Sequence, residues 1–359
     1  MRLNPANRKK RIITFVAILC FFLLLFFVII PSVLCYTIYN SAFDVRFETY
    51  APTAFRLSDF EGLQRTRYTF ASDKQQQLVG YKYFTADTVP VGMVVVAHGF
   101  GGGGHVSYMD CISYFAHHGF WVFAFDATGN DESEGNVGGL PQMVADLDSA
   151  LNFVQSKFPQ LPIVLFGHSW GGYAVSAVLN LHPEVKAVCE FAGFNKSGEL
   201  LRSECEGGLG GYASIVMPYV NLYESFKFKK FAKYSALDGF ANTSAKIIVV
   251  HSKDDDVVPF DDNAALYLQK YQNDPRFEFV ISENKGHSNI LYSQSGIDYL
   301  AEINGKLANY VEGLDGELTA ELKEKWIKEN LDRTRWANML NYELFDKIAD
   351  IFTQAVNAQ

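Results

Sequence analysis

Ser169 stands at a position in the chain where a serine can act as a nucleophile. The stretch GHSWGG at 167–172 follows an apolar run at 163–166 that has the length of a buried strand, and helix-compatible residues continue from 170 to 181. Glycines two positions before and after the serine permit a sharp, strained strand-to-helix turn. The start of the helix directs free N–H groups and its positive dipole end to the same place. The pattern predicts a nucleophile elbow, and an ordinary serine at a helix N-terminus is the alternative.

Hydrolysis by a serine nucleophile requires three further groups. A general base must take the serine proton, an acid must orient the base, and N–H donors must stabilise the oxyanion. The chain has eight histidines, and three aspartates stand together at 254–256 after an apolar run at 246–251. Glycines at 99, 101 and 102 would let the backbone approach a substrate closely. The aspartate triplet is also compatible with a solvated turn.

The elements that would position these groups alternate between strands and helices. A β-hairpin is predicted at 64–71 and 78–84, where β-forming residues flank a polar turn. Strands at 92–98, 121–126, 163–166 and 185–191 then alternate with helices at 109–118, 141–158 and 170–181. The alternation stops at 194–244 and resumes with strands at 246–251 and 277–281 and helices at 261–271, 296–311, 317–331 and 342–355. This order predicts an α/β fold with a mostly parallel central sheet and helices on both faces.

Five stretches resemble the motifs of the α/β-hydrolase superfamily, and in particular of its serine aminopeptidase-like and monoglyceride lipase-like branch. They are HGFGG at 98–102, FDATGNDESEG at 125–135, GHSWGG at 167–172, HSKDDDVVP at 251–259 and GHSNI at 286–290. The resemblance covers about residues 63–355. It implies the α/β-hydrolase fold, with residues 194–244 as the cap insertion.

The resemblance also implies a catalytic triad. Ser169 would be the nucleophile and His287, after the last strand, the general base. Asp255, four positions before Pro259, would be the acid, and its two aspartate neighbours are alternatives. The three residues follow one another in the order Ser, Asp, His that is typical of this fold.

The oxyanion hole would be formed by the backbone N–H groups of Phe100 and Trp170. His98 and His168 are expected to make local hydrogen bonds and to take no part in proton transfer. Asp131 departs from the family pattern, because relatives often carry glycine there. We expect Asp131 to shape its loop without affecting the triad.

The N-terminus predicts a membrane anchor. Basic residues and no acidic ones stand at 1–11, and an apolar run broken only by Thr14 fills 12–30 and resumes after Pro31 as far as 38. About 20 such residues span the hydrocarbon core of a bilayer, and the basic flank favours a cytoplasmic N-terminus with the catalytic domain extracytoplasmic. We expect a single transmembrane helix at 12–38, a linker at 39–62 and the hydrolase domain at 63–359. A cleaved signal peptide is the alternative, although the run is longer than usual and no small-x-small cleavage site follows it closely.

Composition narrows the class of function. The net charge of −9 argues against nucleic-acid binding, and neither an H-E-x-x-H motif nor a Cys/His cluster predicts a metal or cofactor. We expect a membrane-anchored serine hydrolase that cleaves small-molecule or lipid-like carboxylic esters through an acyl-enzyme. An aminopeptidase-like amide hydrolase, an acyltransferase and a non-catalytic binding module on the same fold are the alternatives. The sequence predicts no particular oligomeric state.

Overall fold

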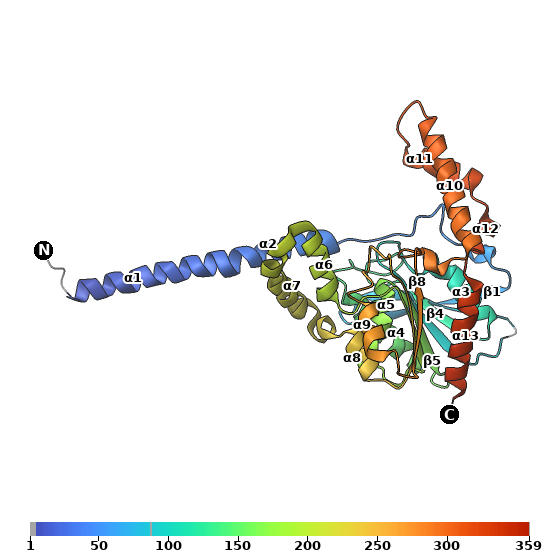
Figure 1. The fold of residues 1–359 in the computed structure, drawn as a ribbon, viewed down its shortest axis with the longest axis horizontal. Helices are drawn as coiled ribbons and strands as arrows, with labels where there is room; N and C mark the ends of the chain where they lie inside the picture. The colour runs from blue at the N-terminus through green and yellow to red at the C-terminus, as the bar shows by residue number, and fades with distance from the viewer. Residues whose placement is uncertain (1–4, 87, 359) are drawn as a thin grey trace.

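A sheet of eight strands forms the centre of the protein (Figure 1). The computed structural model describes residues 5–86 and 88–358, so Arg2 and the rest of the first four residues of the basic N-terminus lie outside the described residues. The strands are β1 (Leu63–Ala71), β2 (Gln77–Thr85), β3 (Met93–Ala97), β4 (Trp121–Phe125), β5 (Ile163–His168), β6 (Ala187–Phe191), β7 (Lys246–Ser252) and β8 (Phe277–Ser282). They lie in the order β1-β2-β4-β3-β5-β6-β7-β8. β2 is antiparallel to β1 and β4, and all strands from β4 to β8 in this order run parallel.

Apolar side chains cover both faces of the sheet. In β3, Met93, Val95 and Ala97 belong to one buried cluster and Val94 and Val96 to another, because successive residues of a strand point to opposite faces. The first cluster includes residues of α4 (Gln142–Lys157), α5 (Trp170–Ala177), α8 (Ala236–Ala241) and α9 (Ala264–Tyr271), and the second includes residues of α3 (Met109–His117) and α13 (Tyr342–Asn357). Figure 1 shows these helix groups on opposite sides of the strands. The predicted α/β-hydrolase architecture is confirmed.

The C-terminal tail differs from its prediction in one element. Between α11 (Ala320–Asn330) and α13 lies a third helix, α12 (Arg333–Ala337), which is too short to produce a helical period in the sequence. It begins at Asp332, whose side chain accepts the N–H groups of the second and third helical residues. α10 (Gln294–Glu312) and α11 share a small apolar cluster around Trp326 and project from the body of the protein (Figure 1).

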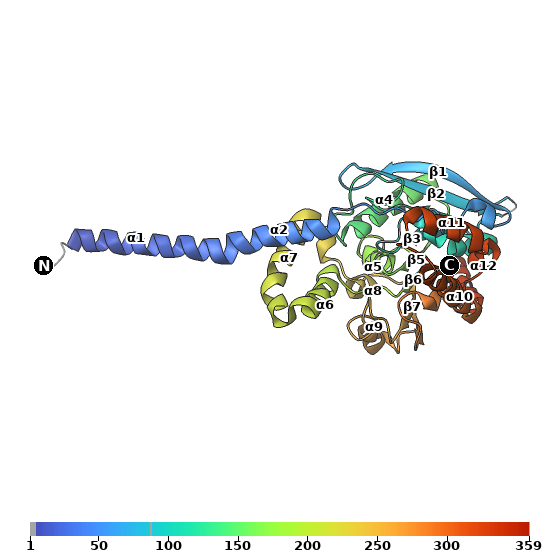
Figure 2. The ribbon, with the colours of Figure 1, turned by 90° about the horizontal axis from the view of Figure 1, so that it is seen from above.

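Residues 194–244, where a cap is expected, form a helical insertion. It consists of α6 (Ser197–Leu209), the 3-10 turn η5 (Gly210–Tyr212), α7 (Ala213–Phe228), the 3-10 turn η6 (Lys229–Lys233) and α8. Figures 1 and 2 both show α6 and α7 beside the N-terminal helix, to one side of the central sheet. The insertion therefore lies between the N-terminal helix and the core of the domain.

The N-terminal helix is continuous through Pro31. It comprises α1 (Pro5–Leu24), a π-helical turn η1 (Leu25–Ile29) and α2 (Ile30–Phe43). A proline lacks the N–H that the carbonyl four residues earlier would accept. That carbonyl belongs to Phe27, and it accepts the hydroxyl of Tyr219 from α7 instead. The stretch Arg8–Phe43 is long and apolar enough to cross a membrane, by length and composition alone.

The last turns of α2 belong to the domain. Cys35, Tyr39 and Phe43 lie four residues apart and are buried, and the Tyr39 hydroxyl donates to Oε1 of the buried Glu224 in α7 at 2.7 Å. The 36-residue stretch Arg8–Phe43 is about 54 Å long, well beyond the roughly 30 Å of a hydrocarbon core. The segment expected as a linker from residue 39 therefore starts as helix and ends its helical part at Phe43.

Candidate active site

Ser169 lies at the sharp turn between β5 and α5. Its backbone angles are φ 58° and ψ −116°, a strained conformation for a residue with a side chain. A Cβ on Gly167 would lie 2.3 Å from the carbonyl oxygen of Gly171, and a Cβ on Gly171 would lie 2.0 Å from the carbonyl oxygen of Ala97. Both glycines are needed because the turn packs directly on backbone. The predicted strand–turn–helix geometry around Ser169 is present.

His287 and Asp255 meet at the carboxyl ends of β8 and β7. Nδ1 of His287 is 2.8 Å from Oδ2 of Asp255, while Oδ1 of Asp255 accepts the N–H groups of Val257 and Val258 at 3.0 and 2.8 Å. Burial would raise the pKa of the Asp255 carboxyl, but the hydrogen bonds from His287 and Val258 outweigh it, and this pKa lies below its ordinary value. Asp255 is therefore ionised next to His287 at neutral pH.

The two neighbouring aspartates have other surroundings. Asp254 is exposed, and its Oδ1 accepts the N–H groups of Lys285 and Gly286 at 3.0 and 3.1 Å, which shapes the loop that carries His287. Asp256 is exposed as well. Among the three, Asp255 is the one whose carboxylate contacts His287.

One pocket of about 260 Å³ brings the separated candidate residues together. Phe100, Ser169 and His287 all line it, although they come from three distant parts of the chain. The pocket is also lined by Gly99, Tyr108, Asp110 and His168. The pocket lies where the carboxyl ends of the parallel strands meet, which is the usual place for a site in an open α/β sheet.

Of the two predicted oxyanion donors, Phe100 lines this pocket, and Trp170 directly follows Ser169, which lines it. Trp170 is the first residue of α5, and the first N–H groups of a helix have no partner within the helix. Within residues 5–86 and 88–358, neither Trp170 nor Phe100 donates its backbone N–H to a protein acceptor. Two free N–H groups at the elbow and at the neighbouring glycine-rich loop match the requirement for oxyanion stabilisation.

A chain of hydrogen bonds joins three loops of the site, and sequence reasoning did not find it. The N–H of Gly99 donates to the hydroxyl of Tyr108 at 3.0 Å. Nε2 of His168 lies 3.3 Å from the carbonyl oxygen of His287, which can only accept, so Nε2 carries the ring proton. Nδ1 of His168 therefore accepts the hydroxyl of Tyr108 at 2.8 Å. Burial, reinforced by the neighbouring His287, lowers the pKa of His168 to about 3, so the ring is neutral.

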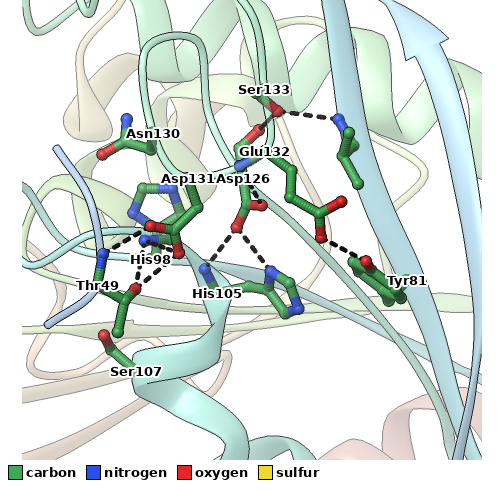
Figure 3. Close-up of polar contacts among 12 residues, drawn as sticks. Thr49, Tyr81, His98, His105, Ser107, Asp126, Asn130, Asp131, Glu132 and Ser133 are labelled. Atoms are coloured by element: carbon green, nitrogen blue, oxygen red, sulfur yellow. Dashed lines mark hydrogen bonds and ion pairs between the residues drawn. The ribbon is translucent and has the colours of Figure 1, made fainter. Parts of the chain in front are cut away.

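His98 and His105 have structural roles as well. Nδ1 of His98 lies 2.8 Å from the Gly99 carbonyl, a local contact of the kind expected, whereas Nε2 accepts the N–H of Ala127, 29 residues away, at 3.0 Å. Nδ1 of His105 lies 2.6 Å from Oδ1 of Asp126 in a fully buried pair. This pair holds the start of the loop after β4, as Figure 3 shows.

Asp110 offers a pH-dependent test of the pocket wall. Burial raises the pKa of its carboxyl from 3.8 to about 6. The folded protein therefore holds this proton more tightly than the unfolded chain, and stability falls as pH rises from about 4 to 6. Asp110→Asn keeps an oxygen for the N–H of Cys111, which Asp110 accepts at 2.8 Å, and should raise the free energy of unfolding by about 2 kcal/mol at pH 7.5 and hardly at all at pH 4. Denaturant unfolding at both pH values measures this, and an equal effect at both would indicate packing instead of ionisation.

The described part of the chain contains no cluster of three or more His, Cys, Asp or Glu side chains arranged to hold a metal ion. The five cysteines are free, and three of them (Cys35, Cys111 and Cys189) are buried.

Part of the chain resembles known proteins in sequence. Residues 88–237 match the family described as serine aminopeptidase, S33. A monoacylglycerol lipase of Mycolicibacterium smegmatis is 32% identical over 117 residues, which are 32% of this chain and 41% of the relative. A monoglyceride lipase of Rattus norvegicus is 33% identical over 95 residues, 25% of this chain and 31% of the relative. The chain thus matches less than half the length of these curated relatives.

Solved structures share the fold. An esterase of Pyrococcus furiosus superposes with a TM-score of 0.52 at 14% identity, covering 76% of this chain and 98% of that one. Acetyl xylan esterase 1 of a Thermoanaerobacterium species gives a TM-score of 0.50 at 14% identity, with 69% and 84% covered. The fold is that of the α/β-hydrolases. In sequence, the chain is similar to the serine aminopeptidase family over residues 88–237 and to monoglyceride lipases over shorter stretches.

Proposed function

We propose that the protein is a serine hydrolase that cleaves carboxylic esters, with Ser169 as nucleophile, His287 as general base and Asp255 as the acid that orients it. One observation carries the proposal: a serine on a strained turn shares a pocket with a histidine that is hydrogen-bonded to a buried aspartate. A strained backbone and a buried carboxylate both cost free energy of folding. A catalytic role for both residues gives a reason for this cost.

In the proposed mechanism, His287 takes the proton of Ser169 while the serine oxygen attacks the ester carbonyl. Asp255 accepts the Nδ1–H of His287 and stabilises the imidazolium that forms. The N–H groups of Phe100 and Trp170 stabilise the oxyanion, each contributing about 3 kcal/mol. His287 then protonates the leaving alcohol, and water, activated by the same histidine, hydrolyses the acyl-Ser169.

The substrate we propose is a lipid-like ester. The two curated relatives are named as lipases of monoacylglycerols, and α7 of the insertion exposes apolar side chains at helical spacing, Ile215, Leu222 and Phe226. The description of the matching family favours a second candidate, an aminopeptidase-like amide hydrolase. An acyltransferase would use the same acyl-enzyme with an alcohol in place of water.

A paired substrate panel tests the proposal. The full-length chain in detergent is assayed with p-nitrophenyl esters of increasing acyl length and, in parallel, with aminoacyl p-nitroanilides, and is treated with a fluorophosphonate probe. We expect ester hydrolysis and covalent labelling. Faster cleavage of the anilides would favour the peptidase, and the absence of both turnover and labelling would reject an enzyme in favour of a binding module.

We also propose that residues 12–38 contain a single membrane-spanning helix that anchors the protein, with the N-terminus cytoplasmic and the hydrolase domain outside. Its apolar side chains are exposed, for example Phe15 at 67% and Phe27 at 66%, and basic residues fill 8–11 on one flank only. The protein should stay in the membrane during an alkaline carbonate wash and dissolve only in detergent. A mature chain that lacks these residues by mass spectrometry would indicate a cleaved signal peptide instead.

A further inference from the structure

The segment that follows the N-terminal helix runs along a loop beside the candidate active site. Residues 43–49, here called the strap, lie next to residues 129–138. The N–H of Phe47 donates to the carbonyl of Gly129 at 2.9 Å, and the N–H of Asp131 donates to the carbonyl of Phe47 at 3.0 Å. The guanidinium of Arg46 donates to three carbonyls of the same loop, those of Asp131, Ser133 and Gly135. The strap precedes the part of the chain that matches the family.

The end of the strap is tied to the glycine-rich loop through Asp131 (Figure 3). Oδ1 of Asp131 accepts the N–H of Thr49 at 2.6 Å, and Oδ2 accepts the Thr49 hydroxyl at 2.7 Å and the N–H of Gly104 at 2.9 Å. A Cβ on Gly103 would lie 2.2 Å from Oγ1 of Thr49. The strap and the glycine-rich loop are therefore in direct contact, and one carboxylate joins them.

Phe100 is held between the strap and the nucleophile elbow. Its ring packs edge-to-face against Phe43 and Phe47 of the strap, with ring centroids 5.9 and 5.0 Å apart. On the elbow side it packs edge-to-face against Trp170, at 5.4 Å. The residue whose N–H is the proposed oxyanion donor thus depends on the strap for two of its three aromatic contacts.

We propose that the strap is a positioning element of the active site, in which Thr49 and Asp131 hold the glycine-rich loop so that the N–H of Phe100 meets the oxyanion. Four consecutive glycines at 101–104 give that loop many alternative conformations. The N–H of Phe100 therefore keeps one position only if contacts from outside the loop hold it there. The strap continues directly from the helix that ends at Phe43, which makes the N-terminal segment part of the catalytic unit. This inference rests on the proposed function.

Four variants of the full-length chain test the inference. Thr49→Val removes the hydroxyl and Thr49→Ser keeps it, while Asp131→Asn replaces one of the two acceptor oxygens of the carboxylate with an amide nitrogen. Asn136→Ala is the matched control, because Asn136 donates to Oδ1 of Asp44 in the strap at 2.6 Å but does not reach the glycine-rich loop. The readouts are kcat and KM for a p-nitrophenyl ester, and the inhibition constant of phenylboronic acid, whose serine adduct mimics the tetrahedral intermediate.

For Thr49→Val and Asp131→Asn we expect kcat to fall about 10- to 100-fold with KM within about two-fold, since small displacements of a catalytic group have effects of this size. The boronic acid should bind more weakly by the same factor. Thr49→Ser should recover most of the rate, and Asn136→Ala should match the wild type.

Wild-type kcat in both variants, or a fall in kcat with unchanged boronic acid affinity, would overturn the role of the strap. If Asp131→Asn fails to fold, the comparison of Thr49→Val with Thr49→Ser is sufficient. These two variants differ in the hydroxyl that donates the hydrogen bond to Asp131. A wild-type protein with neither turnover nor fluorophosphonate labelling would overturn the proposed function itself, which is a distinguishable result.

Discussion

Replacing Ser169 by alanine should lower kcat for ester hydrolysis by about 10⁴-fold or more and abolish fluorophosphonate labelling, because the proposed mechanism forms the acyl-enzyme on the Ser169 hydroxyl. The free energy of unfolding should change little, since alanine inherits the same strained backbone, with φ 58° and ψ −116°. Steady-state kinetics with a p-nitrophenyl ester and denaturant unfolding measure the two effects. Ser295→Ala, at an exposed serine of α10, is the matched control.

His287→Ala should have an effect of similar size, and the double variant with Ser169→Ala should be hardly worse than either single one. Residues that act as one catalytic unit are strongly non-additive. His117→Ala, at an exposed histidine at the end of α3, controls for loss of an imidazole. A Ser169→Ala protein that keeps its activity to within tenfold would contradict the assignment of the nucleophile.

Gly171→Ala should destabilise the protein by about 3 kcal/mol or more and remove its activity. The new Cβ would lie 2.0 Å from the carbonyl oxygen of Ala97 and 2.9 Å from that of His98. These are backbone atoms at the end of β3, which is hydrogen-bonded to strands on both sides, so the clash cannot be relieved by a side-chain rotation, and overpacking of this kind is costly. Urea unfolding measures the loss.

Gly305→Ala is the control for this glycine. It lies on an exposed position of α10, and a Cβ added there would have no neighbouring atom within 4 Å, so alanine should stabilise the protein by about 0.5–1 kcal/mol. Equal stability of Gly171→Ala and the wild type would show that the elbow has room that its geometry does not suggest.

Local sequence patterns determined the sheet and the elbow. The continuous apolar run MVVVA becomes β3 because a strand buried on both faces needs apolar residues at every position. The GHSWG stretch becomes a strained turn because its glycines let backbone pack on backbone, as the contact between Gly171 and Ala97 demonstrates. Such information is contained within a dozen neighbouring residues, so periodicity and composition are sufficient to find it.

Hydrogen bonds between distant residues were decided by the tertiary structure. The contact of His287 with Asp255 joins residues 32 apart, that of Tyr108 with His168 residues 60 apart, and that of Thr49 with Asp131 residues 82 apart. A motif could point to Asp255, but only the packed loops bring its carboxylate, and not a neighbour's, to the imidazole. Asp131 was expected merely to shape its loop, and the structure shows that its carboxylate also joins the glycine-rich loop to the strap.

The N-terminal segment shows most clearly which features follow from the local sequence and which depend on the tertiary structure. Hydropathy alone predicted a long apolar helix, because transfer of side chains into lipid is a property of each residue. Its extension to Phe43, its packing on Glu224 through Tyr39 and the path of the strap depend on what surface the folded domain presents. The sequence of the strap has no periodic pattern that could predict its contact with Asp131, 82 residues further along the chain. Its position beside the candidate active site therefore depends on the folded loops that it contacts.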